Sequence, residues 1–260
     1  MNTDQVTLYT NPATLLQKLI QFDTTNPPGN ETDCVRYLND LLTSAGLETQ
    51  ILEKKPGRSN LIARLQGAGF APPFLLQGHT DVVSAADQSW THPPFKGLIA
   101  DGYIWGRGAL DMKGPLAMMI SAVLQLKAQG ITPPGDIVLA IVADEEDEGE
   151  FGARYLVEEH PELFKGIQCA IGEIGGFTLL INHKKFYPIM IAEKQKCTLR
   201  TVIKGPAGHG SMPIRNGATA KLSYLLHKIN TRHLPVHITP PVRLMLEGLT
   251  KHLSFPANLV

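Results

Sequence analysis

The residues that could carry out chemistry are an imidazole and several carboxylates that follow short apolar runs. They are His79 and Asp81 after FLLQG, Glu145 and Glu146 after IVLAIVA, and Glu173 after CAIG. Histidine nitrogens and carboxylate oxygens bind borderline divalent cations such as zinc. The sequence therefore points to metal-assisted chemistry, which has to be weighed against a structural role for each residue.

His79 and Asp81 are separated by one residue in the tetrapeptide GHTD. In an extended segment, residues two apart point to the same side. A carboxylate that accepts the second imidazole N–H fixes the histidine tautomer and raises the basicity of a metal ligand. The alternative is a hydrogen-bonded pair that only holds a loop at a strand end.

The acidic run DEEDE at 144–148 has an equally plain alternative, because such runs are usually solvated loops or helix N-termini. It directly follows a segment that is apolar on both faces, where adjacent carboxylates repel one another unless a cation neutralises them. If one carboxylate binds metal, its neighbour can act as a base. We take Glu145 and Glu146 as that pair and expect the later acids to be solvated: Asp147, Glu148 and Glu150.

Asp111 lies in the glycine-punctuated stretch GRGALDMKG, where it could simply cap a helix, and Glu173 could be a turn residue. Taken together with His79, Glu145 and Glu146, they suit two zinc ions bridged by one carboxylate. Competing chemistries lack their motifs. The sequence has no GxxxxGK[ST] phosphate loop and no GxSxG nucleophile elbow, and GRGALDMKG lacks dinucleotide-binding spacing.

The predicted elements alternate between helices and strands and indicate an α/β layered domain with a mainly parallel sheet. Ligands bind beyond the carboxyl ends of strands in such sheets, which is where the acids lie. The element ends are marked by Asn30 as a helix cap, Gly46 and Gly130 as helix stops, and Asp101-Gly102 as a hairpin turn. Helices are predicted at 12–22, 31–45, 113–129 and 152–159, and strands at 47–52, 59–65, 73–78, 135–143 and 168–172.

The pattern changes from about residue 186. Alternating apolar residues over 186–205 predict two half-buried strands or one bent strand, and 217–232 reads as a helix. These elements indicate the beginning of a second, α+β domain.

Composition excludes several classes of protein. The 24 basic and 24 acidic side chains balance, which argues against a nucleic-acid or anionic-membrane binder. We find neither a signal-peptide pattern nor an apolar run of about 18–20 residues that could span a bilayer. The three scattered cysteines, Cys34, Cys169 and Cys197, are expected to be buried free thiols in a reducing cytoplasm.

Six stretches in order resemble the co-catalytic zinc metallopeptidases and deacylases. This family includes aminoacylase, succinyl-diaminopimelate desuccinylase, acetylornithine deacetylase and the glutamate and Gly-X carboxypeptidases. The stretches are TTNPPGNE (24–31), GHTDVV (78–83), WTHPPFKGLIADGYIWGRGALDMKG (90–114), ADEEDEGEFGARYL (143–156), GEIGG (172–176) and GHGSMP (208–213).

The resemblance implies a role for each residue. His79 and Glu173 would bind one zinc, Asp111 would bridge both ions, and Glu146 would bind the second. Glu145 would be the general base, Asp81 would orient the His79 ring, and a cis peptide bond would follow Asp111. Co²⁺ is expected to substitute for zinc. His209 would reach the partner subunit's active site and stabilise an oxyanion, the alternative being a plain turn histidine.

The implied fold is a three-layer, zinc-exopeptidase-like catalytic domain at 1–184, followed by part of an inserted lid and dimerisation domain at 185–260. We expect the chain to stop inside this lid, before the last zinc-binding histidine and the arginine for the substrate carboxylate. The implied partner is a second copy, bound through the lid.

Two functions remain open. One is hydrolysis of an amide bond in small peptides or N-acyl amino acids by a hydroxide held between two zinc ions, with glutamate as the base. The other is a non-catalytic metal-binding or dimerising fragment. The motifs favour the broad carboxypeptidase and aminoacylase branches over a biosynthetic desuccinylase.

Overall fold

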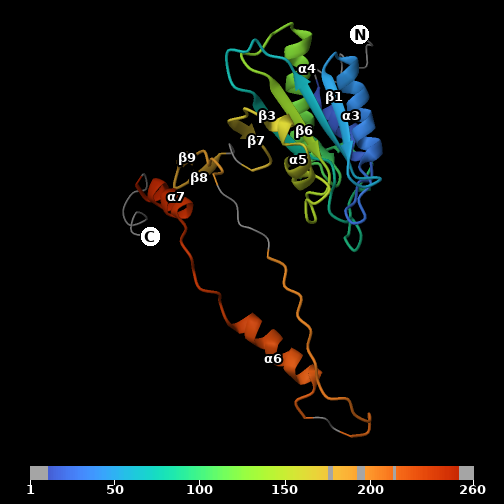
Figure 1. Cartoon of the computed structure of the whole chain (residues 1–260), viewed down its shortest axis with the longest axis vertical. Helices are drawn as coiled ribbons and strands as arrows, with labels where there is room; N and C mark the ends of the chain where they lie inside the picture. The colour runs from blue at the N-terminus through green and yellow to red at the C-terminus, as the bar shows by residue number, and fades with distance from the viewer. Residues whose placement is uncertain (1–10, 175–177, 192–196, 213–214, 252–260) are drawn as a thin grey trace. The chain divides into compact units, whose positions relative to one another are not determined.

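The computed structural model describes residues 11–174, 178–191, 197–212 and 215–251. The chain divides into two compact units, residues 1–175 and 176–260, which are described separately. Figure 1 shows both units. The functional boundary predicted after residue 184 stays a prediction.

The first unit contains a five-stranded sheet in the order β1-β2-β6-β3-β7. Strands β6, β3 and β7 are parallel neighbours, whereas β2 is antiparallel to both β1 and β6. Four strands therefore run in one direction and β2 alone runs in the other, which confirms the mainly parallel sheet. The strands are β1 Glu48–Glu53, β2 Ser59–Leu65, β3 Phe74–His79, β6 Ile137–Val142 and β7 Cys169–Ile171.

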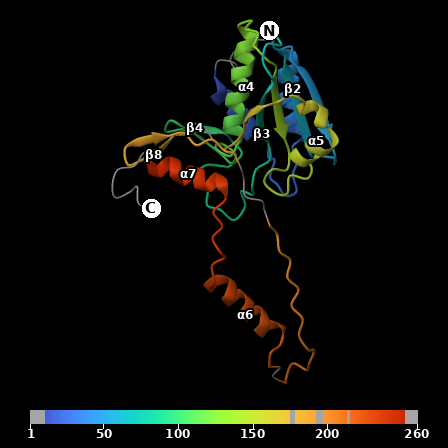
Figure 2. The ribbon, with the colours of Figure 1, turned by 60° about the vertical axis from the view of Figure 1, so that its left-hand side comes forward.

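Helices cover both faces of this sheet, and Figure 2 shows α4 and α5 on opposite sides of it. Apolar residues of the first three helices form one core with Leu139 and Ile141 of β6. Val138, Ala140 and Val142 of the same strand pack on the other face with α5. The helices are α2 Pro12–Ile20, α3 Thr32–Ser44, α4 Lys113–Ala128, α5 Ala153–Glu159 and the 3-10 turn η1 Pro161–Phe164.

Turn residues end the elements largely as predicted. Gly46 and Gly130 have φ of 80° and 65°, just after α3 and α4, where a left-handed residue ends a helix. Asp101 and Gly102 join β4 (Leu98–Ala100) to β5 (Tyr103–Trp105).

The Asn30 cap is wrong. The residue at the N-cap position of α3 is Glu31, and its side chain does not cap the helix because it pairs with Arg58 instead.

The second unit begins with a hairpin of β8 (Leu179–Ile181) and β9 (Lys184–Phe186). Helix α6 (Ala218–Thr231) confirms the helix predicted there, and α7 (Pro240–Lys251) follows it. The strands predicted over 186–205 are wrong for 187–191 and 197–204, which pair with no neighbour in the described part of the chain. An alternating pattern cannot form a strand unless a partner supplies the hydrogen bonds.

The cysteine prediction holds only in part. All three thiols are free and Cys34 is buried, but Cys169 and Cys197 are exposed. Cys169 lies on β7, an edge strand whose residues are all exposed, which explains the error. Within the described residues, no helix combines the length and the apolar character needed to cross a bilayer.

Candidate metal centre

The predicted site residues lie where three neighbouring strands end. β3 ends at His79, which lies opposite Val142, the last residue of β6. Glu145 and Glu146 follow β6, and Glu173 follows β7. Because β6, β3 and β7 are parallel, these side chains meet at one edge of the sheet, and Asp111 joins them from the loop before α4.

The His79 imidazole is fully buried, and its Nε2 atom faces the carboxylates. Nε2 lies 3.1 Å from Asp111 Oδ1, 3.7 Å from Glu145 Oε2 and 3.9 Å from Glu173 Oε2. These acids are 56%, 45% and 32% exposed, respectively. The site therefore combines a buried nitrogen donor with oxygen donors that are partly exposed to solvent.

Asp81 holds the other side of the imidazole. His79 Nδ1 lies 2.9 Å from the Asp81 carbonyl oxygen and 3.4 Å from its carboxylate. The same carboxylate accepts hydrogen bonds of 3.1 Å from the backbone N–H groups of Glu145 and Glu146. Burial alone would raise the pKa of Asp81, but hydrogen bonds from His79 and Asn26 hold it below its usual range. This arrangement suits the orienting role predicted for Asp81.

The donor atoms fit divalent metal. His79, Asp111 and Glu146 form one group of ligands and His79, Glu145 and Glu173 form another, each with its atoms within 4.8 Å of one another. One nitrogen with several carboxylate oxygens suits a borderline cation such as zinc. Glu145, predicted to be the base, also stands within reach of a ligand position, so the division of roles between it and Glu146 stays a prediction.

The pKa shifts of the site residues indicate that the carboxylates repel one another when no cation neutralises them. Burial, followed by the hydrogen bond and charge of Asp111, raises the pKa of Glu173 to about 7. Burial and the charge of Asp111 also raise the pKa of Glu146. Burial lowers the pKa of His79, but Asp81 and Glu145 outweigh it and raise that pKa to about 9. A bound cation would relieve this crowding.

The structure brings together all six site residues predicted in the first unit, and the peptide bond after Asp111 is cis, as predicted. The three acids expected to be solvated are exposed. His209 belongs to the second unit, where its exposed ring accepts or donates a 2.7 Å hydrogen bond at Ser211 Oγ. Its role in a partner's site stays a prediction.

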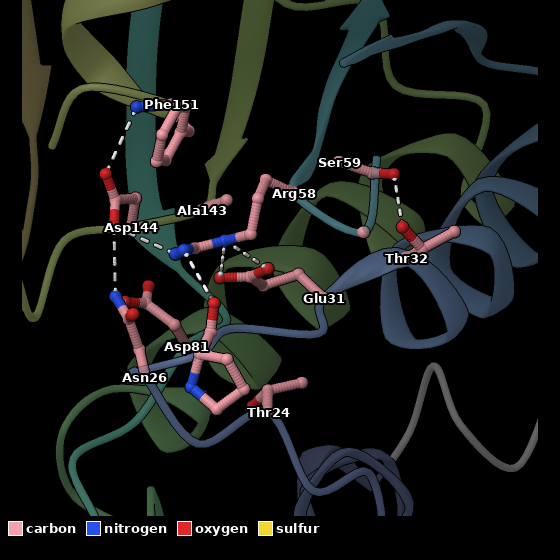
Figure 3. A network of polar contacts seen from close by, with 12 residues as sticks. Thr24, Asn26, Glu31, Thr32, Arg58, Ser59, Asp81, Ala143, Asp144 and Phe151 are labelled. Carbon is pink, nitrogen blue, oxygen red and sulfur yellow. Dashed lines mark hydrogen bonds and ion pairs between the residues drawn. The ribbon is translucent and has the colours of Figure 1, made fainter. Parts of the chain in front are cut away.

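A buried polar network behind the site was missed by the sequence analysis. Arg58 pairs with Glu31 and Asp144, and Asn26 bridges Asp144 and Asp81 (Figure 3). Asn26 and Glu31 lie in the quoted stretch TTNPPGNE, and Asp144 lies two residues after β6, so each carried a positional signal. Arg58 carried none.

The sequence of this chain is similar to that of a known peptidase family. The model of peptidase family M20/M25/M40 matches residues 75–242. Succinyl-diaminopimelate desuccinylase of Paracoccus denitrificans (strain Pd 1222) is 36% identical over 223 residues, which are 84% of this chain and 56% of that protein. The chain thus spans about half the length of the curated relatives it matches.

Solved structures share the fold. Human carnosine dipeptidase 1 matches with a TM-score of 0.54 and 22% identity, over 65% of this chain and 39% of that one. An M20 family metallo-carboxypeptidase from Sulfolobus solfataricus matches with a TM-score of 0.53 and 21% identity, over 66% and 37%. With the family model covering more than half of its residues, this chain belongs to peptidase family M20/M25/M40.

Proposed function

We propose that this chain is part of a zinc-dependent hydrolase that cleaves an amide bond in small peptides or N-acyl amino acids. The observation that carries the proposal is the buried His79 imidazole, which faces carboxylates from three separate segments at one sheet edge. Membership of a peptidase family supports the choice of bond.

In this proposal His79 and Glu173 would hold one zinc, Glu146 would hold the second, and Asp111 would contribute to both positions. Two bound zinc ions would lower the pKa of a water molecule toward neutrality and polarise the amide carbonyl. Asp81 would keep Nε2 of His79 directed toward the metal position, because its carbonyl and carboxylate oxygens engage Nδ1.

Glu145 is proposed as the proton carrier. Its carboxylate is 45% exposed and lies 3.7 Å from His79 Nε2, so it borders both the metal position and solvent. It would take a proton as water attacks the carbonyl and deliver that proton to the leaving amine.

Residues 185–260 are proposed to begin a lid and dimerisation domain, with residues 1–184 as the catalytic domain. His209 of one subunit would then donate a hydrogen bond to the oxyanion formed in the other subunit. We further propose a cytoplasmic location, because three free thiols suit a reducing compartment.

The names of similar proteins point to more than one class of substrate. The Paracoccus relative is named a desuccinylase and a 35% identical Staphylococcus aureus (strain MRSA252) protein a probable one, whereas the structural neighbours include a dipeptidase and a carboxypeptidase. The substrates that these enzyme names imply all contain an amide bond near a free carboxylate. We propose the shared class, without preferring the carboxypeptidase branch.

The second candidate is a non-catalytic metal-binding or dimerising fragment. It is favoured by the observation that the chain spans only 56% of the Paracoccus relative.

A pair of proteins separates the two candidates: this chain, and the same chain extended with the corresponding C-terminal part of the Paracoccus relative. We expect about two zinc ions per extended chain by elemental analysis, together with hydrolysis of N-succinyl-diaminopimelate, N-acetyl amino acids or dipeptides. Metal content below one zinc and no turnover in either protein, even with added Zn²⁺ or Co²⁺, would rule out the hydrolase.

A further inference from the structure

Arg58 places a charged group deep behind the acidic end of β6. Its side chain is only 4% exposed. Its Nε donates to both carboxylate oxygens of Glu31 at 3.1 and 2.9 Å, its Nη2 to Asp144 Oδ1 at 2.9 Å, and its Nη1 to the carbonyl of Pro28 at 3.1 Å. A planar guanidinium donates from three nitrogens in a fixed fork and so reaches three separated partners, whereas the ammonium of lysine donates from a single nitrogen.

The pocket around this guanidinium is shaped to hold it. A Cβ on Gly29 would lie 2.2 Å from Arg58 Cζ, and the φ of Gly29 is +77°, so only glycine fits there. Arg58 Cζ also lies over the Phe151 ring, 5.5 Å from the ring centroid. The arginine is therefore enclosed by two segments distant in sequence, and Figure 3 shows them converging on it.

The partner Asp144 shapes the backbone that carries the two candidate acids. Its φ is +64°, and its carbonyl accepts from the N–H of Gly149 at 2.8 Å. Its carboxylate accepts from Phe151 N–H at 3.1 Å and from Arg58. Asp144 thus closes the segment 144–151 on itself, with Arg58 as its counterion.

Asn26 connects this pair to the metal centre. Its Nδ2 donates to Asp144 Oδ1 at 3.1 Å and to Asp81 Oδ2 at 2.8 Å. Asp81 in turn accepts from the N–H groups of Glu145 and Glu146. A continuous chain of buried and partly buried hydrogen bonds therefore runs from the guanidinium to the backbone of both acids.

We propose that Arg58 is the positioning residue for the Glu145–Glu146 pair. By neutralising and anchoring Asp144, it fixes the turn from β6 into the acidic segment and so directs both carboxylates toward His79. The inference rests on the proposed function only for what those acids do; the positioning itself concerns this chain without metal.

The chain offers a matched control at the other end of the same pair of strands. Arg64 of β2 pairs with Asp136, just before β6, at 2.7 Å, whereas Arg58 precedes β2 and pairs with Asp144, just after β6. Both are arginine–aspartate pairs between the same two segments. Only one of them adjoins the metal centre.

The direct test is backbone hydrogen exchange of the metal-free chain, measured by mass spectrometry. Arg58→Lys should speed exchange within residues 144–151 by about tenfold or more and leave that of α4 unchanged, since opening is local. Arg64→Lys should leave exchange in 144–151 unchanged. If Arg58→Lys exchanges like wild type there, or faster by the same factor throughout the first unit, the proposal is wrong.

If Arg58→Lys does not fold, the same exchange measurement on Asn26→Ala tests the proposal. This substitution removes the link from Asp144 to Asp81 without unpairing the arginine. The same two outcomes apply to it.

Cobalt titration supplies an independent readout. We expect Arg58→Lys to weaken Co²⁺ binding by about 10- to 100-fold, as changes behind metal ligands do, and Arg64→Lys to leave it nearly unchanged. Equal affinities in wild type and Arg58→Lys would count against positioning. If wild type binds no cobalt yet the exchange pattern holds, the proposed function fails and the positioning role stands.

Discussion

His79 and Asp111 are 32 residues apart in the sequence, yet Nε2 of the histidine lies 3.1 Å from Oδ1 of the aspartate. The first residue ends a central strand and the second lies in the loop before α4. Nδ1 of the histidine is engaged by the Asp81 carbonyl oxygen, which orients the ring with Nε2 toward Asp111. The nitrogen donor is thus aimed before any cation binds, and binding requires little further ordering of that residue.

Replacing each of the two adjacent glutamates in turn tests which one is the base and which one is the metal ligand. In the extended, active protein, Glu145→Gln should lower kcat by about 10²- to 10⁴-fold, because the proton carrier is lost, with zinc content unchanged. Glu146→Gln should instead lower zinc affinity. Elemental analysis and steady-state kinetics of both variants check this. Zinc loss in Glu145→Gln with retained zinc in Glu146→Gln would mean that the base and the ligand are reversed.

Zinc affinity should rise with pH. His79, with a pKa of about 9, keeps its proton at neutral pH in the metal-free chain, and a ligand must release it. Affinity should therefore increase about tenfold per pH unit between 7 and 9 from this group alone. Below pH 7, Glu173 releases a second proton and the dependence steepens. Calorimetry in buffers of different ionisation enthalpy counts these protons, and a Glu173→Gln variant should lose the extra steepness.

The stability of the metal-free chain should fall over the same range. Both groups have a folded pKa above the ordinary value, so each stabilises the fold at low pH and loses that contribution as pH rises through the folded pKa. For Glu173 the window is 4.5 to about 7, and for His79 it is 6.5 to about 9. Thermal unfolding with chelator at pH 5, 7 and 9 should give falling midpoints. A rising midpoint would contradict the assignment.

Lys113 is a buried ammonium whose loss should be costly. Its Nζ donates to the carbonyls of Leu19 and Phe22, at the end of α2, at 3.1 and 2.8 Å. Lys113→Met leaves both acceptors without this donor, so we expect the free energy of unfolding to drop by about 1.5–3 kcal/mol. Lys127→Met, on the exposed end of the same helix, should change it by less than about 0.5 kcal/mol. Urea titrations of both variants measure the difference.

His209 is proposed to act across subunits, and mixed dimers test this. In the extended protein, Glu145→Ala and His209→Ala should each be inactive, but a mixture should regain part of the activity. In a mixed dimer, one site combines the intact base of one chain with the intact histidine of the other. A confirmed mixed dimer without recovery would leave His209 with no role in the partner's site.

Much of the fold was predictable because its signals are local. β6 is apolar on both faces and lies in the middle of the sheet, and Gly46 and Gly130 stop their helices through their own backbone freedom. The site residues were found for the same reason, since His79 ends β3 and Glu173 lies two residues after β7. Parallel pairing then brings strand ends together without further information.

The errors arise where long-range contacts decide. Glu31 takes the N-cap position of α3, rather than Asn30, while its carboxylate pairs with an arginine 27 residues away. The surrounding sequence of Arg58, KKPGRSN, resembles any polar turn, and only the register between β2 and β6 sets it opposite Asp144. The alternating pattern over 186–205 likewise does not say which strand would pair with this segment.

The single reversed strand has a consequence for how such sites are searched for and redesigned. In a sheet whose strands all run one way, the rim that binds ligand receives only the residues that leave each strand. Because β2 runs against β6, the residue entering β2 reaches that rim as well. Positions that precede an antiparallel strand therefore belong in any mutational library aimed at this rim, although they stand far from every motif in the linear sequence.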